Sequence, residues 1–184
     1  MGEKITSKVI GELEQDDEFD DWWKSKEIEI PFLDNKKLSV RFTEFYPEED
    51  AAFIDEADAA LACFLKLTTE DRNAVSEMAY QNCMDFLEKF EEDEDDDPLR
   101  EMKDKNDIWD YIDPQEISVS RRPYNDKDIY IQILCECDWE QEHGLQFIFR
   151  QGKKLTRISG QDGHLTQADA SGKPDNEDEL LSQF

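Results

Sequence analysis

The stretch Ile129-Tyr-Ile-Gln-Ile-Leu-Cys-Glu-Cys137 alternates apolar residues with others and leads into an acidic, turn-forming sequence. Successive side chains of a β-strand point to opposite faces, so every second residue shares one face. The residues on that face are Ile129, Ile131, Ile133, Cys135 and Cys137. Unpaired cysteine behaves as a small hydrophobe that is commonly buried. We therefore predict a core strand over residues 128–137, with both thiols continuing a row of isoleucines.

Three further apolar runs predict the neighbours of this strand, at residues 116–120, 145–150 and 155–159. Gln151-Gly152-Lys153 separates the last two runs and supplies the glycine that a tight hairpin needs. These strands should form an antiparallel meander.

A second strand pair is predicted upstream, where residues 27–32 and 38–42 alternate in the same way. The sequence Asp34-Asn35-Lys36-Lys37 between them suits a turn, which predicts a β-hairpin. Pro31 cannot donate a backbone hydrogen bond, so its strand should lie at an edge or be bulged.

The apolar spacing changes to a helical period at Glu48 and predicts a helix to about Leu67. Thr68 and Asp71 resemble a capping box, which predicts a second helix that extends to about Phe90. The predicted fold class is α+β: an antiparallel β-sheet meander with an αα-hairpin packed on one face.

The 184 residues suit a single α+β domain, which we place at residues 27–165. We expect residues 1–26 to form an acidic, partly ordered lead-in, and residues 166–184 to form a mobile acidic tail. The run of carboxylates at 91–97 predicts a solvated acidic loop within the domain. A short helix is expected over residues 99–112, ending before Pro114.

The net charge of the chain restricts the classes of partner that it can bind. With 48 acidic and 21 basic residues, the formal net charge is -27. Such a chain repels phosphate backbones and anionic membranes, so neither nucleic acid nor a membrane surface is an expected partner. A basic protein is the favoured partner, with an association that weakens as salt screens the field. Arg121 and Arg122 should form local ion pairs with acids on the helices or the tail.

The location of the protein is predicted from what the sequence lacks. No apolar run approaches the ~20 residues that a membrane helix needs. The four cysteines do not form the dense pattern of a disulfide framework, and no signal peptide precedes them. These features predict a cytoplasmic protein.

The segment 135–143 carries the residue types that catalysis favours, and three interpretations apply to it. Structural use is the first, with Asp138, Glu140, Glu142 and His143 bonding turn amides beside Gly144. Metal binding is the second, since both thiols with His143 and His164 make a Cys2His2 set of zinc-ligand types, although the spacing is not a usual one. A cysteine nucleophile with a histidine base is the third.

Tryptophans near acidic residues are candidate anchors for a basic partner. Trp22 and Trp23 are adjacent, so in an extended segment their side chains face opposite ways. We assign no catalytic residue, no metal ligand and no cofactor. The candidate binding residues are Trp22, Trp23, Asp138, Trp139, Glu140, Glu142 and His143.

The run Trp139-Glu-Gln-Glu-His-Gly144, between two predicted strands, resembles a Trp-acid-x-Glu-His-Gly signature in a family of small uncharacterised bacterial domains. Residues 28–33 and 108–112 are also similar to that family, and the resemblance covers residues 27–159. It implies proteins similar to toxin-immunity partners with no established reaction, so no catalytic residue is carried over.

The favoured function is non-enzymatic binding of a basic protein, of the immunity or antitoxin kind. The alternative is a hydrolase or metal-dependent enzyme that uses the segment 135–143. The two differ in geometry, because an enzyme requires its thiols, carboxylates and histidine to converge in a pocket.

Overall fold

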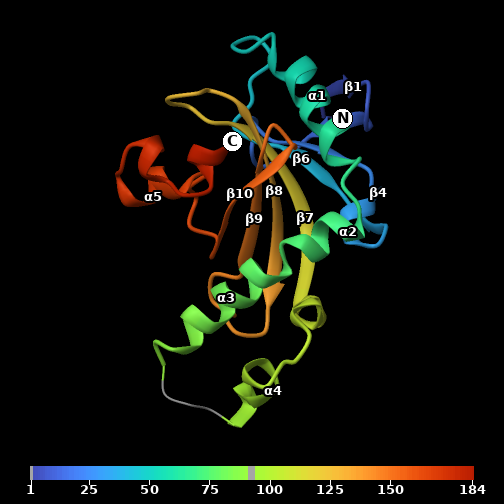
Figure 1. Ribbon diagram of the computed structural model, residues 1–184. Coiled ribbons are helices and arrows are strands. Elements are labelled where there is room, and N and C mark those ends of the chain that lie inside the picture. The colour runs from blue at the N-terminus through green and yellow to red at the C-terminus, as the bar shows by residue number, and fades with distance from the viewer. Residues whose placement is uncertain (1, 91–93) are drawn as a thin grey trace.

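The computed structural model describes residues 2–90 and 94–184 and confirms the α+β class. A twisted eight-stranded sheet runs through the molecule, with helices on one face and the C-terminal segment on the other (Figure 1). In sheet order, its strands are β1 (Lys4–Ser7), β2 (Gly11–Gln15), β3 (Trp23–Ser25), β6 (Val40–Phe42), β7 (Ile112–Arg121), β8 (Ile129–Cys137), β9 (Leu145–Arg150) and β10 (Lys154–Ser159).

The predicted meander is confirmed for β7 to β10, which pair consecutively and antiparallel. Ile133 lies opposite Ile117 on β7 and Phe147 on β9, and all three are fully buried. The predicted row on β8 faces this core, with Cys135 fully buried and Cys137 only 5% exposed. At the β9–β10 turn, Gln151 and Gly152 both take positive φ angles, as the tight turn requires.

The helices lie in the connection between β6 and β7, which pair in parallel. Parallel neighbours need a crossover, and this one carries α1 (Phe53–Phe64), α2 (Thr69–Ala74) and α3 (Ser76–Leu87) across one face of the sheet. The helix α1 packs on β7 and β8, whereas α3 packs on β10. The covered face holds a continuous apolar core.

The predicted second helix is divided in two. The capping box of Thr68 and Asp71 is confirmed at the start of α2. The helix nevertheless ends at Ala74, followed by the cap residue Val75 with a ψ of 0°, and α3 begins at Ser76. The hydroxyl of Ser76 accepts a hydrogen bond from the Trp109 indole at 2.9 Å, so this break ties α3 to the segment before β7.

The predicted hairpin at 27–42 is present in a shorter form. The strands β4 (Ile28–Ile30) and β5 (Lys36–Leu38) make a separate two-stranded sheet, while residues 40–42 leave it to become β6. Pro31 opens a 3-10 turn, η1 (Pro31–Leu33), rather than lying in a strand. Asp34 and Asn35 take positive φ angles at the turn, a conformation that these residue types tolerate.

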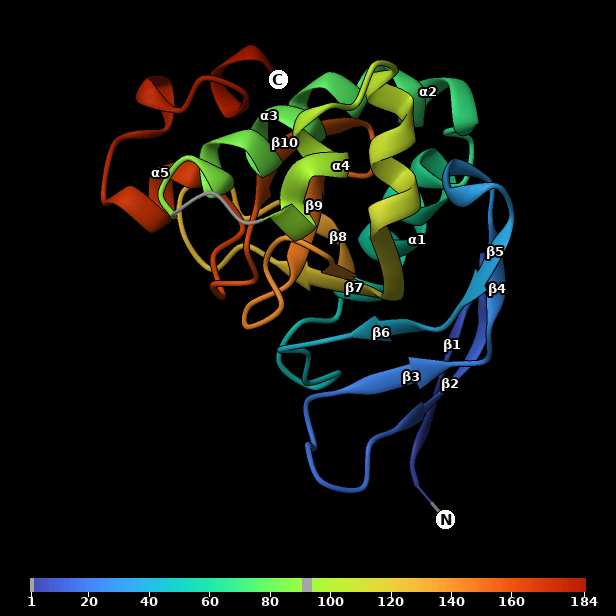
Figure 2. The same ribbon diagram turned by 90° about the horizontal axis from the view of Figure 1, so that it is seen from below.

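The residues predicted as an acidic lead-in form β1, β2 and β3 instead (Figure 2). Leu13 and Trp23 point into the core and are 0% and 1% exposed. The buried carboxylate of Asp58 on α1 accepts hydrogen bonds from the Ser7 hydroxyl and the Lys8 amide, which fastens the β1–β2 turn to the helix layer. Only one or two apolar residues per strand face inward, so the alternation is hard to see in the sequence.

The segment predicted as a mobile tail is folded onto the sheet. It contains α5 (Gln167–Ser171) and the 3-10 turns η4 (Asp175–Glu177) and η5 (Leu181–Gln183). Ala168 and Leu181 pack against Tyr130 and Ile148 on the face opposite the helices. This apolar contact escaped the sequence argument because it depends on two isolated residues.

The acidic run at 91–97 is described in part, since residues 91–93 lie outside the described ranges. Residues 94–96 form the 3-10 turn η2 and lead into α4 (Asp97–Arg100). The short helix predicted at 99–112 is replaced by the end of α4 and the 3-10 helix η3 (Lys105–Tyr111). Pro114 does not follow a helix but lies within β7, next to an irregularity in the register.

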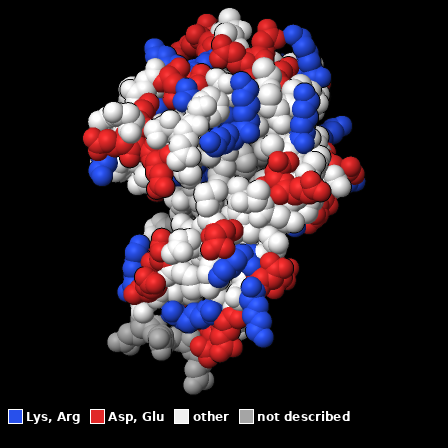
Figure 3. Space-filling model, in the orientation of Figure 1, with Lys and Arg blue, Asp and Glu red and all other residues white. Residues whose placement is uncertain are grey.

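Charged side chains of both signs occur on the visible face of the space-filling view, where acidic and basic side chains are interspersed (Figure 3). Both predicted arginine pairs are confirmed: Arg121 binds Asp50 and Glu56 near α1, and Arg122 binds Asp169 and Asp175 of the C-terminal segment. Guanidinium groups that bind acids within the fold are less available to outside anions.

Candidate functional site

The Trp139 to Gly144 motif forms the turn between β8 and β9. One carboxylate oxygen of Glu140 accepts hydrogen bonds from the amides of Glu142 at 3.0 Å and His143 at 3.2 Å. These bonds lower the pKa of Glu140 against the opposing effect of its partial burial. Trp139 is 6% exposed and packs in the core. Trp139 and Glu140 of the motif therefore have structural roles in this turn.

Gly144 is required by the backbone at this position. Its φ is +60°, and a Cβ atom there would lie 2.5 Å from the carbonyl oxygen of Cys135. The same carbonyl accepts a hydrogen bond from the Gln161 side chain at 2.9 Å. The turn, the end of β8 and the loop after β10 are thus closely packed together.

Glu140 contacts two of the residues that the enzyme alternative uses, His143 and Cys137, through different atoms. The exposed imidazole of His143 lies 3.4 Å from Glu140, while the thiol of Cys137 donates to the Glu140 carbonyl from inside the fold. His164 pairs instead with Asp162, through atoms 3.6 Å apart. Within residues 2–90 and 94–184, no group of three or more histidine, cysteine or carboxylate side chains is placed to hold a metal ion.

Burial also changes the chemistry of the thiols. It raises the pKa of Cys135 well above its ordinary value, and that of Cys137 to about 11. A nucleophilic cysteine works as the thiolate, and these pKa shifts favour the neutral thiol at neutral pH.

Of the three candidate tryptophans, only Trp22 presents part of its ring to solvent. Its ring stacks on Phe19 at 4.3 Å and lies under the Arg41 guanidinium at 4.5 Å. Trp23 is buried, and its indole donates to the Phe45 carbonyl at 3.1 Å. Trp22 precedes β3, and β6 and β7 separate that strand from β8, so the structure does not join it to the acidic turn.

A hollow of about 410 Å³ lies beside the predicted turn, where β7 begins and β8 ends. We call it the acidic hollow, and its lining residues are Asp110, Tyr111, Ile112, Asp113, Glu136, Cys137, Asp138 and Gln141. Of the predicted binding residues, only Asp138 lines it. Asp110, Asp113 and Glu136 were not predicted, because they come from separate segments that only strand pairing brings together.

Two carboxylates of the acidic hollow are close enough in the sheet for their repulsion to destabilise the fold. Asp113 and Glu136 lie directly opposite each other across β7 and β8, and like charges in such pairs are destabilising. Lys36 reaches Asp113 at 2.5 Å and lowers its pKa. The hollow thus holds four carboxylates, of which Asp113 binds Lys36.

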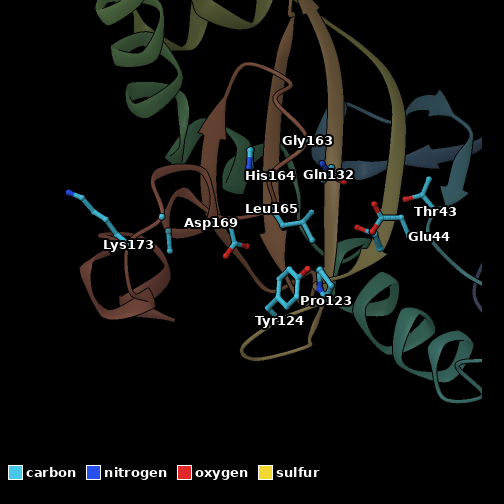
Figure 4. A pocket seen from close by; sticks show the side chains of 13 residues that line it. Thr43, Glu44, Pro123, Tyr124, Gln132, Gly163, His164, Leu165, Asp169 and Lys173 are labelled. Atoms are coloured by element: carbon cyan, nitrogen blue, oxygen red, sulfur yellow. The ribbon is translucent and has the colours of Figure 1, made fainter.

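A larger cleft of about 520 Å³ lies on the opposite face of the sheet from the helices (Figure 4). Its floor includes Ser120 and Gln132 of β7 and β8. One wall is the loop with Thr43 and Glu44, and the other is the chain from Gly163 to α5. We call this site the polar cleft.

The domain of unknown function DUF6985 matches residues 9–165, so the chain belongs to that family of domains. The predicted resemblance to an uncharacterised domain family is confirmed to this extent, and the relation to immunity proteins stays a prediction. No curated protein and no solved structure matches the chain. Among the described residues, no helix combines the length and the apolar character needed to cross a bilayer.

Proposed function

We propose that the protein binds a basic protein partner without catalysing a reaction, and that the acidic hollow receives a lysine or arginine side chain of that partner. The observation that carries this proposal is the set of four carboxylates in one concave site. Lys36 already pairs with Asp113, so an entering cation would chiefly compensate the negative charge of Glu136, which faces Asp113 across the strands.

The charge of the whole chain supports the same conclusion. A net charge of -27 accelerates encounters with a basic protein and disfavours acidic competitors. The charges on the face in Figure 3 are interspersed, so this long-range field does not specify a contact point there. The carboxylates of the acidic hollow give a cationic side chain of the partner a defined contact point, which the long-range field of the net charge does not provide.

The turn at residues 138–144 has a supporting role in this proposal. Glu140 and Gly144 shape the end of β8, and Asp138 follows that strand into the hollow. The amide of Asp138 donates to the Tyr111 carbonyl at 3.1 Å, which links the two sides of the site. Trp23 and Trp139 stabilise the fold from inside and do not act as anchors in the proposed interface.

The test is co-purification of tagged protein from the cells that encode it, starting with the product of the adjacent gene as the candidate partner. We compare the wild type with a variant carrying Asp110→Asn, Asp113→Asn, Glu136→Gln and Asp138→Asn. A matched control neutralises four exposed acids away from the hollow, by Asp17→Asn, Glu18→Gln, Glu177→Gln and Glu179→Gln.

We expect a basic protein to be retained at low salt and released as salt rises. Its affinity should fall at least about tenfold in the hollow variant, because each charge-assisted hydrogen bond is worth about 1.5 kcal/mol or more. The control should lose much less. Equal retention by both variants, or retention that salt does not affect, would refute the proposal.

A further inference from the structure

The polar cleft is built from segments that are distant in the sequence, and both polar and apolar side chains line it. Glu44 and Gln132 approach it from one side, and Leu165 and Asp169 from the other, with Tyr124 and Pro123 at one end (Figure 4). A ligand with an apolar part and a polar end could therefore contact the apolar side chains while its polar end reaches Ser120 and Gln132 on the floor.

Two acceptors of the cleft lining keep hydrogen-bonding capacity for a ligand, the Gln132 carbonyl and the Glu44 carboxylate. The amide nitrogen of Gln132 donates to Gln146 at 3.0 Å, so its carbonyl oxygen remains to accept. Within the described part of the chain, the exposed carboxylate of Glu44 forms no hydrogen bond or ion pair. The lining cation, Lys173, extends away from the cleft in Figure 4.

The carboxylate of Asp169 contributes less, since Arg122 donates to both of its oxygens at 2.7 and 2.8 Å. Glu44 is thus the main free charge that faces a ligand. Its φ of +55° is uncommon for a residue other than glycine, and the loop holds this conformation at the cleft wall.

The aromatic ring at the rim is the third element of the site. Tyr124 is 70% exposed, and among the described residues its ring neither stacks on another ring nor contacts a cation. With Pro123 and Leu165 it offers flat apolar surface beside the acceptors. A ligand that fits must therefore be rich in donors, positively charged, and able to lie against an aromatic face.

We infer that the polar cleft binds the guanidinium group of an arginine. The group is planar, stacks on aromatic rings and carries five N–H donors, so its chemistry suits the Tyr124 ring, the Glu44 carboxylate and the Gln132 carbonyl that line the cleft. A lysine ammonium provides the charge but not the flat face. The inference uses a site separate from the acidic hollow and does not depend on the proposed partner.

The test is NMR titration of the full chain, following backbone amide shifts. The probe is the capped tripeptide N-acetyl-Gly-Arg-Gly-amide, and its controls replace arginine by lysine or by the uncharged isostere citrulline. Free arginine is a separate arm, because a guanidinium can reach the cleft on a protein or as a small molecule. The protein variants are Glu44→Gln and Tyr124→Ala, with Glu18→Gln as a control on another loop.

We expect the arginine peptide to shift the amides of Gln132, Ser120 and Tyr124. Glu44→Gln should weaken binding about tenfold, as expected when a charge-assisted hydrogen bond is lost. Tyr124→Ala should also weaken it, and Glu18→Gln should not. Stronger binding of the capped peptide than of free arginine would identify a protein-borne ligand, whereas the reverse would identify a small molecule.

Equal binding of the citrulline or lysine peptide would overturn the inference, as would binding that Glu44→Gln leaves unchanged. Shifts confined to Asp113, Glu136 and Asp138 would also overturn it, while supporting the acidic hollow. The two proposals therefore fail separately.

Discussion

The side chains of Glu140 and His143 show how residue types common in active sites can serve a turn. Glu140 accepts two amide hydrogen bonds and holds the backbone at the point where Gly144 reverses the chain. His143 remains exposed beside it. A carboxylate that satisfies turn amides needs no substrate to explain its position.

Substitution of Gly144 tests this structural role. Gly144→Ala should lower the free energy of unfolding by at least about 2 kcal/mol, since it combines a positive φ with a severe backbone contact. Gly163→Ala is the matched control, because Gly163 also has a positive φ but has open space around it. Its loss should be about 1 kcal/mol. Equal losses in urea denaturation would argue against the contact with Cys135.

The cysteines give a second prediction for single residues. Cys83, Cys135 and Cys137 are buried and Cys63 is partly exposed, so iodoacetamide should modify Cys63 first in the native protein. Burial raises the pKa of Cys83 to about 12, which further lowers its reactivity. Mass spectrometry of the native and urea-unfolded protein gives the comparison. Rapid native labelling of Cys135 would show that the end of β8 opens.

Among the elements, the C-terminal segment depends most clearly on a single residue. The fully buried side chain of Arg122 bonds Asp126, Asp169 and Asp175, and it thereby fastens α5 and η4 to the end of β7. Arg157 makes a similar link to Asp162 in the loop before α5. Ion pairs therefore supplement the few apolar contacts that hold this segment.

Acid should release the C-terminal segment before the sheet unfolds. Arg122 lowers the folded-state pKa of Asp169 and Asp175, so their contribution is complete above the unfolded pKa of about 3.9. It is lost as the pH falls from there through the lowered folded values. Amide hydrogen exchange of Ala168 and Leu181 should accelerate in this range, while Ile131 on β8 stays protected. Simultaneous loss of protection at all three would contradict a separable segment.

Substitution of Arg122 tests the same ion pairs at neutral pH. Arg122→Met should destabilise the protein by about 3 kcal/mol, because it leaves three aspartates close together without their cation. Arg121→Met is the control, as Arg121 is partly exposed and its pairs with Asp50 and Glu56 are more accessible to water. Urea unfolding should show the smaller loss for Arg121→Met.

For the whole molecule, the excess of 27 negative charges opposes the compact state. Raising the ionic strength from about 0.01 M to about 0.15 M shortens the Debye length from about 30 Å to about 8 Å. We therefore expect the free energy of unfolding to rise over this range. Choline chloride should act as sodium chloride does if screening is the cause. Stabilisation by sodium chloride alone would indicate binding of a specific cation.

Much of the central fold could be predicted because each strand of the β7–β10 meander has a recognisable apolar pattern in its own sequence. The alternation from Ile129 to Cys137 and the glycine turn at Gly152 express local rules of side-chain direction and backbone freedom. The capping box at Thr68 is likewise a local pattern. The N-terminal strands carry too few inward apolar residues for the same rules to reveal them.

The amino-acid sequence by itself determined the acidic character of the protein, the buried thiol row and the central antiparallel strands, because charge and alternation are properties of neighbouring residues. Only the tertiary structure decided that Asp110 and Asp113 meet Glu136 and Asp138 in one hollow. It likewise decided which acids of the C-terminal segment Arg122 binds, and that this segment forms a wall of the polar cleft. The physical reason is that these sites depend on strand register and on contacts between distant segments, which no local pattern encodes.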